Sequence, residues 1–188
     1  MIASKIYDEL WRVAPINLAE ILLRRDERQF ELQKLLLEGK NLVVCLALNI
    51  PGPVKNSASL KRFFNAESTA LQTELMNSGH GLEFSSRLEL KTGPEAYMSI
   101  EPVDNFEKIE QLKKKLIAFE EAKAWRRLLD IDLVYNGKYL GREVYGLEPR
   151  SCLICARAAR DCARSRRHEL TDLLLEIAKL IAMSGIGD

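Results

Sequence analysis

Apolar residues recur at helical spacing in three stretches of the chain: 17–38, 57–77 and 105–123. Intervals of three and four positions are typical of helices that pack one face against a core. Asn17 and either Ser57 or Ser59 can cap the first two helices, and residues 78–81 end the second. The residues expected to face the core are Leu18, Ile21, Leu22, Phe30 and 35–37, then Leu60, Phe63, Phe64, Leu71 and Leu75, then Phe106, Ile109, Leu112, Leu116 and Phe119.

Short apolar runs bounded by turn residues predict five strands: 41–50, 82–91, 96–103, 128–135 and 138–145. Pro51-Gly52-Pro53 ends the first strand, because proline cannot donate to a sheet ladder. Residues 92–95 can form a turn between the second and third strands, and Asn136-Gly137 predicts a hairpin between the last two. The region from about 152 to 183 is predicted to be helical, with a break near 165–168.

This order of helices and paired strands predicts an α+β fold, with a mixed sheet, flanking helices and a C-terminal helical segment over about 150–188. A length of 188 residues is enough for one sizeable core, so we expect a single domain over 1–188.

Charge and hydropathy limit the classes of partner. Lys and Arg number 28 against 27 Asp and Glu, a net charge of +1, which argues against coating nucleic acid or membrane with the whole surface. No apolar run reaches the roughly 18 residues of a membrane span, and Lys5, Asp8 and Glu9 interrupt any signal peptide. We therefore expect a cytoplasmic protein with reduced cysteines and with neither membrane nor nucleic acid as a partner.

The strand at 128–135 carries the strongest chemical signal. Successive side chains alternate between the faces of a strand, so Asp130 and Asp132 project together, roughly 7 Å apart along the chain, while Leu129 and Ile131 take the other face. Two carboxylates side by side suit Mg²⁺, which prefers oxygen ligands and substrate phosphates. The alternative is an edge strand with a solvated polar face, although aspartate is depleted in strands.

Three cysteines and a histidine lie close together in the sequence: Cys152, Cys155, Cys162 and His168. They could make a tetrahedral zinc site. If 152–164 is one helix, however, the thiols share a small apolar face, and His168 points away unless the chain breaks near Ser165, so we favour buried core cysteines over zinc. The opposite face of such a helix would carry an arginine stripe (Arg157, Arg160, Arg164 and Arg167), suited to an anionic partner or to solvent.

Several segments in order, over about residues 14–180, resemble the apo-citrate lyase phosphoribosyl-dephospho-CoA transferase family. They are Leu22–Arg28, Pro51–Ser57, Phe64-Asn65, Gly93–Glu95, Leu128–Asp132, Arg150–Cys155 and Cys162–Arg164, followed by His168.

The resemblance implies a nucleotidyltransferase with a polymerase-β-like core. Such an enzyme moves the phosphoribosyl-dephospho-CoA group from 2′-(5″-triphosphoribosyl)-3′-dephospho-CoA to a serine of the citrate lyase acyl carrier (gamma) subunit, and pyrophosphate leaves. It implies Mg²⁺ on Asp130 and Asp132, which would be the catalytic pair. Glu143, expected on the neighbouring strand, is a candidate base.

Basic residues would then bind the substrate's phosphates. Lys55 follows a buried strand and can act as a point charge, or it is an ordinary solvated lysine. Arg25 and Arg28 are i, i+3 neighbours that could clamp phosphate oxygens, although the acids beside them also permit ion pairs within the helix. Arg126 and Arg127 complete the expected substrate-binding set.

One departure from the family pattern leaves alternatives open. The family has glycine four residues before the first aspartate, where this chain has Arg126, whose guanidinium could grip phosphate instead. The alternatives are the equivalent transferase for the malonate decarboxylase carrier protein and a non-catalytic, zinc-stapled basic module that binds nucleic acid or an acidic protein.

Overall fold

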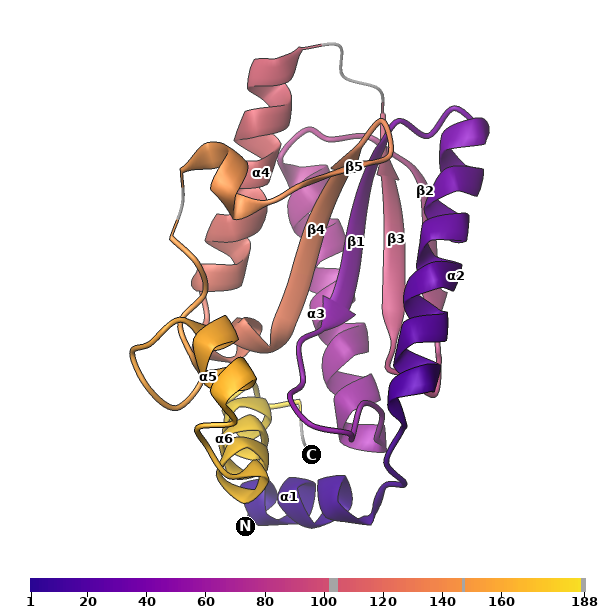
Figure 1. Cartoon of the computed structure of the whole chain (residues 1–188). Helices are drawn as coiled ribbons and strands as arrows, with labels where there is room; N and C mark the ends of the chain where they lie inside the picture. Colours follow the sequence, from indigo (N-terminus) through magenta and orange to yellow (C-terminus); the bar gives the residue numbers. More distant parts are fainter. Residues whose placement is uncertain (102–104, 147, 187–188) are drawn as a thin grey trace.

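The computed structural model describes residues 1–101, 105–146 and 148–186, in which six helices surround a five-stranded sheet (Figure 1). The α-helices are α1 (Ile2–Arg12), α2 (Leu18–Leu37), α3 (Ala58–Asn77), α4 (Phe106–Glu121), α5 (Ala159–Ser165) and α6 (Leu170–Met183). The strands are β1 (Leu42–Leu48), β2 (Leu82–Leu88), β3 (Glu95–Ile100), β4 (Leu129–Tyr135) and β5 (Lys138–Leu140). Two 3₁₀ helices are η1 (Ala124–Leu128) and η2 (Arg142–Tyr145).

The sheet order is β2-β3-β1-β4-β5, and every pairing between these strands is antiparallel. The α+β class is confirmed, but the predicted mixed sheet is wrong. Helices α3 and α4 each connect two strands that run in the same direction, and a third, antiparallel strand lies between the members of each pair. The segment from β1 to β4 thus has the β-α-β-β-α-β order of the ferredoxin-like split motif.

The two faces of the sheet are covered differently. Side chains of β1, β3 and β4 form the main core with α3, α4, α1 and α6. A smaller cluster on the other face joins Leu32 and Leu35 of α2 to Val43, Cys45, Tyr97 and Val134. Helix α2 thus covers this second face, and it passes in front of β2 in Figure 1.

The local signals at element ends are confirmed. Asn17 caps α2 in a capping box with Glu20, and Ser57 caps α3. Asn136 and Gly137 both have positive φ, 48° and 75°, as a two-residue hairpin turn requires. The strand after this turn is shorter than predicted, because η2 replaces its second half. Strand β3 ends at Ile100, and the end of the predicted strand at 103 lies outside the described residues.

Some of the expected core residues are exposed instead. All five expected residues of α3 are buried, as are those of α4 except Phe106. In α2, however, Leu18, Leu22, Phe30 and Leu37 are exposed, because the stripe that meets the sheet contains Arg24, Leu32 and Leu35. Helix α1 was not predicted, although Ile6 and Leu10 are one turn apart and buried among the core residues.

The C-terminal region differs most from the prediction. The break near 165–168 is confirmed, since α5 ends at Ser165 and the next residue, Arg166, is in the left-handed conformation (φ 46°). Residues 152–158 are not helical: Ser151 and Ala158 form an isolated β-bridge that closes a loop between them. The arginine stripe therefore does not exist as a helix face, although its members remain exposed.

Within the described residues, none of the helices is both long enough and apolar enough to cross a bilayer.

Arg126 is partly buried and has a structural role. Its Nε donates to Glu67 Oε2 (2.7 Å), Trp125 Nε1 donates to the other carboxylate oxygen (2.7 Å), and the guanidinium lies 3.6 Å from the centre of the Phe119 ring. Glu67 is buried, so the ion pair with Arg126 offsets the free-energy cost of burying its carboxylate.

We expect Arg126→Ala to lower the free energy of unfolding by about 3 kcal/mol, because Glu67 would be left as a buried, unpaired charge. Urea denaturation measures this loss. The control Arg87→Ala removes an exposed arginine and should change stability by less than about 0.5 kcal/mol. Equal stability of the two variants would contradict the structural role of Arg126.

Candidate functional site

Asp130 and Asp132 lie on the face of β4 that α2 covers. Leu129, Ile131 and Leu133 are buried in the main core on the opposite face. Asp132 is paired in register with Cys45, and Asp130 with Ala47. The predicted alternation is therefore present, and it turns both carboxylates toward α2.

Antiparallel register adds a third carboxylate to this face. Ala47 is opposite Asp130 on one side and Glu95 on the other, so the two acids flank a small alanine. Neighbouring strands are about 4.8 Å apart, which separates the backbones of Glu95 and Asp130 by about 10 Å. The short Ala47 side chain leaves space between them.

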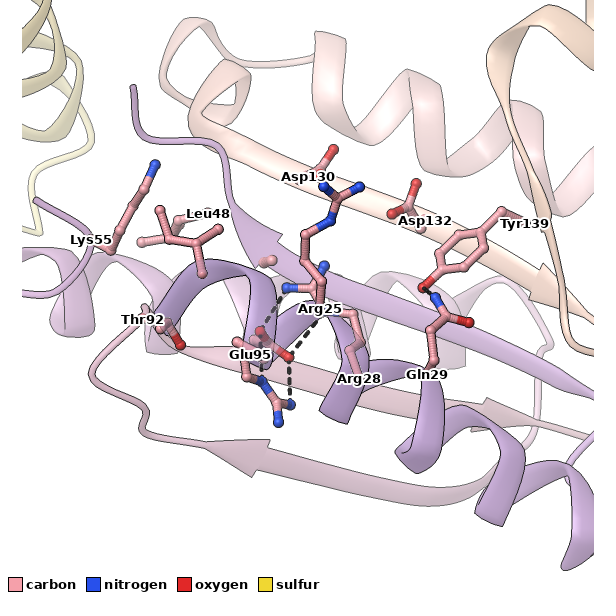
Figure 2. A pocket seen from close by; sticks show the side chains of 13 residues that line it. Arg25, Arg28, Gln29, Leu48, Lys55, Thr92, Glu95, Asp130, Asp132 and Tyr139 are labelled. Atoms are coloured by element: carbon pink, nitrogen blue, oxygen red, sulfur yellow. Dashed lines mark hydrogen bonds and ion pairs between the residues drawn. The ribbon is translucent and has the colours of Figure 1, made fainter. Parts of the chain in front are cut away.

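A cavity of about 440 Å³ occupies this space, between the sheet and the N-terminal half of α2 (Figure 2). Gln29 Nε2 donates to Tyr139 Oη (3.3 Å), which links α2 to β5 at one side of the cavity. The cavity is lined by Ile21, Arg24, Arg25, Arg28, Gln29, Ala47, Leu48, Lys55, Thr92, Glu95, Asp130, Asp132 and Tyr139.

Glu95 is buried and is held by two arginines of α2. Arg24 Nη2 donates to Glu95 Oε2 (2.9 Å), and Arg28 Nη2 donates to Glu95 Oε1 (2.6 Å). Tyr97 Oη also donates to Glu95 (2.8 Å). Burial alone would raise the pKa of Glu95, but the hydrogen bonds from Arg24 and Arg28 hold it below its ordinary value. This carboxylate is therefore ionised and fully paired.

The pKa of Asp132 is shifted in the opposite direction from that of Glu95. Burial, and then the neighbouring charge of Asp130, raise the pKa of Asp132 to about 6. The positive charges of Lys113, Arg150 and Arg28 oppose this rise in pKa but do not cancel it. The carboxylate pair thus carries negative charge that the protein only partly compensates, which is the environment in which a divalent cation binds.

Two predicted phosphate-binding residues line the same cavity from other elements. Arg25 is exposed and extends from α2 toward Asp130 (Figure 2). Lys55 Nζ donates to the carbonyl of Ile50, and burial lowers the pKa of Lys55. Gly93 has φ +113°, and a Cβ there would lie 3.1 Å from the carbonyl oxygen of Lys55, so the turn before β3 packs directly on the Lys55 loop.

Arg150 reaches Asp130 from the C-terminal region. Its Nη2 lies 3.3 Å from Asp130 Oδ1, its Nη1 donates to Leu129 O (2.6 Å), and it also pairs with Glu120. Glu120 in turn accepts from the backbone N–H of Ile131 (3.0 Å), at a part of β4 that the short β5 does not reach. The side chains of Glu120 and Arg150 thus satisfy backbone hydrogen-bonding groups at the edge of β4, beside the two aspartates.

Three other residues from the sequence analysis lie elsewhere. Arg126 pairs with Glu67, as described above. Arg127 Nη2 donates to Ser151 O (3.1 Å), Ser151 Oγ (3.0 Å) and Cys152 O (2.8 Å), and neither arginine lines the carboxylate cavity. Glu143, expected on a strand, belongs to the exposed η2 and does not line it either.

Arg24, Glu95, Tyr139 and Arg150 were not assigned to the site from the sequence. The spacing of Arg24 and Arg28 was a usable signal, since i, i+4 residues share a helix face. Glu95 lies at the start of a buried strand, and a buried carboxylate needs a cationic partner because an unpaired charge is costly to remove from water. Arg150 could not be found this way, because its approach to Asp130 depends on the loop that follows it.

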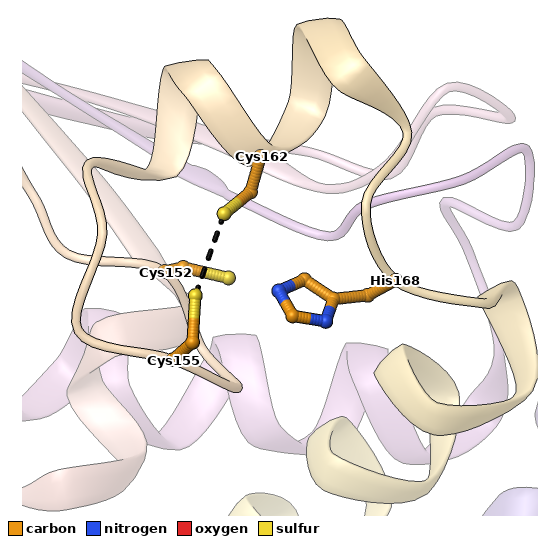
Figure 3. Close-up of side chains that lie close together, drawn as sticks. All are labelled: Cys152, Cys155, Cys162 and His168. Atoms are coloured by element: carbon orange, nitrogen blue, oxygen red, sulfur yellow. Dashed lines mark hydrogen bonds between the residues drawn. The ribbon is translucent and has the colours of Figure 1, made fainter.

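The fold also brings together the four candidate zinc ligands, because 152–158 is a loop and not part of one helix, and because the predicted break after α5 turns His168 toward the thiols. The ligand atoms of Cys152, Cys155, Cys162 and His168 all lie within 4.8 Å of one another (Figure 3). Cys152 and Cys162 are buried, as expected for core cysteines, and the four residues form a Cys₃His group able to hold a metal ion.

Comparison with known proteins agrees with the resemblance seen in the sequence. Residues 16–184 match the family model described as apo-citrate lyase phosphoribosyl-dephospho-CoA transferase. Proteins of that name from Escherichia coli O139:H28 and Shigella flexneri serotype 5b are each 35% identical over 167 residues, 88% of this chain and 88% of their own length. These names favour neither the malonate decarboxylase alternative nor a binding module. The chain belongs to the apo-citrate lyase phosphoribosyl-dephospho-CoA transferase family.

Proposed function

We propose that this protein transfers the phosphoribosyl-dephospho-CoA group from its triphosphate precursor to a serine of the citrate lyase acyl carrier subunit. The observation that carries the proposal is the cavity in which Asp130 and Asp132 on β4 face Arg25 and Lys55. Carboxylates that bind a metal and cations that bind phosphates are the parts that nucleotidyl transfer needs. Membership of the family supplies the substrate class.

Asp130 and Asp132 would hold Mg²⁺. The raised pKa of Asp132 supports this assignment, because it comes from burial and then from the negative charge of Asp130, and the nearby cations do not cancel these effects. When bound, the ion would neutralise charge on the triphosphate and on the leaving pyrophosphate. Arg150, 3.3 Å from Asp130, would keep that carboxylate oriented.

Arg25 and Lys55 would bind the triphosphate as it enters between α2 and the sheet. Arg28 is engaged with Glu95, so we assign it chiefly to positioning α2. The serine hydroxyl would attack the α-phosphorus in line, its proton would pass to a base, and the bond to pyrophosphate would break. Most of the acceleration would come from positioning and charge neutralisation.

The acyl carrier subunit is the proposed protein partner. Five exposed arginines in and beside α5 support contact with an acidic surface. They are Arg157, Arg160, Arg164, Arg166 and Arg167. A cytoplasmic location is part of the same proposal.

Asp130→Asn should abolish transfer, by at least about 10³-fold, because it removes a metal ligand while nearly keeping the side-chain volume. Mass spectrometry of the apo-carrier subunit after incubation with the triphosphate precursor and Mg²⁺ detects the added group. Asp8→Asn, at an exposed position of α1, is the matched control and should transfer normally. Transfer by Asp130→Asn at the wild-type rate would refute the assignment of the carboxylates.

Arg25→Ala and Lys55→Met should each raise the KM for the triphosphate precursor by about 10- to 100-fold, the value of a charge-assisted hydrogen bond. The KM for the carrier subunit should change little. Steady-state kinetics with each substrate varied in turn measures both constants. Lys138→Ala, in the exposed β4–β5 hairpin, should leave both constants unchanged. A change confined to the carrier KM would argue against phosphate binding.

Asp132 should make stability depend on pH without added magnesium. Because the pKa of Asp132 is raised to about 6, the folded chain keeps a proton that the unfolded chain loses near pH 4. The free energy of unfolding should therefore fall as the pH rises from about 4 to 6 and then level off. Asp132→Asn should gain about 1–2 kcal/mol relative to wild type across this window, measured by urea denaturation. Parallel pH curves for the two proteins would contradict the raised pKa.

A further inference from the structure

The cysteine cluster is assembled from three separate parts of the chain. Cys152 and Cys155 lie in the loop closed by the Ser151–Ala158 bridge, Cys162 lies in α5, and His168 follows the turn after α5. In Figure 3 the imidazole ring points at the three sulfur atoms. Because 152–158 is a loop and the chain turns after α5, His168 joins the three thiols in one cluster.

Backbone hydrogen bonds help to hold this convergence. The Cys152 N–H donates to Arg157 O (2.7 Å), and the Ala159 N–H donates to Arg150 O (2.8 Å). After α5, the left-handed Arg166 turns the chain back, and the Arg167 N–H donates to Cys162 O (3.1 Å). A non-glycine residue with positive φ is uncommon, and here it returns His168 to the thiols.

The side chains of the cluster are incompletely paired. His168 Nε2 is buried and has no hydrogen-bond partner in the described part of the chain. The three cysteines are free thiols, and Cys155 Sγ lies 3.5 Å from Cys162 Sγ, against about 2.05 Å in a disulfide. A buried imidazole nitrogen left unpaired costs about 1–3 kcal/mol, so the arrangement needs a ligand to complete it.

The ligand set selects the ion. Three thiolates and one imidazole suit zinc in a tetrahedral site, with Zn–S near 2.3 Å and Zn–N near 2.0 Å. Those bond lengths give separations of about 3.4–3.8 Å between ligand atoms, so a cluster already within 4.8 Å needs only a small contraction. Four protein ligands leave no open position, which is typical of a structural rather than a catalytic ion.

We propose that Cys152, Cys155, Cys162 and His168 bind one structural Zn²⁺, and that this ion fixes the loop that positions Arg150 beside Asp130. Binding converts the three thiols to thiolates and releases their protons. Arg150 immediately precedes the bridged Ser151, and Arg127 donates to the carbonyls of Ser151 and Cys152, so the loop is joined to η1 just before β4. The link to activity rests on the proposed transferase function, whereas the zinc site does not.

Metal analysis of the full-length protein, purified without chelator from zinc-supplemented cells, tests the site. We expect about one zinc per chain in the wild type, and less than about a tenth of that in Cys162→Ser and His168→Gln. The matched controls Cys45→Ser and His80→Gln change residues outside the cluster and should keep their zinc. Wild-type protein without bound metal, or equal zinc content in His168→Gln and His80→Gln, would overturn the metal site. Bound iron in place of zinc would overturn the identity of the ion.

A measurement on wild-type protein keeps the test decisive if the cluster variants fail to fold. Replacement of the ion by Co²⁺ should produce the visible bands of tetrahedral cobalt and thiolate-to-cobalt charge transfer in the near ultraviolet. Absence of these bands, or an intramolecular disulfide between Cys155 and Cys162, would overturn the proposal.

Transfer activity tests the connection to Arg150. Removal of zinc should lower transfer to the carrier, and zinc, but not additional magnesium, should restore it. Arg150→Gln should lower transfer while retaining about one zinc per chain, because Arg150 is not a ligand. Full activity after verified zinc removal would overturn the link to Arg150 and leave the zinc site standing. If the wild type shows no transfer at all, the proposed function fails, and zinc content still decides the metal site.

Discussion

The buried carboxylate of Glu95 is the contact on which the candidate site depends, because it joins α2 to the sheet. Arg24 and Arg28 are one helical turn apart and both donate to it. Sliding α2 along the sheet would separate this buried carboxylate from both arginines and leave its charge unpaired, so such a shift is costly. Arg25 follows Arg24 and is rotated by about 100° around the helix, which turns it out of the ion pair and toward the cavity.

The charges on this sheet face are compensated unequally. Glu95 has two guanidinium partners and a lowered pKa, whereas Asp132 has a raised one. Three acidic residues on one face of a sheet repel one another and do not stabilise the fold. Unfavourable local arrangements of this kind are expected at functional sites. The small Ala47 between Glu95 and Asp130 provides the space that a substrate phosphate would need.

The same site depends on a distant part of the chain. Strand β5 is too short to pair with the first residues of β4, so Glu120 and Arg150 satisfy that edge with their side chains. Arg150 is in turn the residue before the loop that carries Cys152 and Cys155. The conformation of the cysteine loop therefore affects the position of Arg150 beside Asp130, although about twenty residues separate Asp130 from the first cysteine of the loop.

The sequence by itself determined the features that depend on near neighbours. The caps Asn17 and Ser57, the Asn136-Gly137 hairpin and the projection of Asp130 and Asp132 from one face of a strand follow from backbone geometry over a few residues. Only the tertiary structure decided that β1 pairs with β3 and β4, that Arg28 is held by Glu95 while Arg25 remains open, and that His168 meets the cysteines. The physical reason is that burial and ion pairing join residues far apart in the chain, and local periodicity carries no record of those partners.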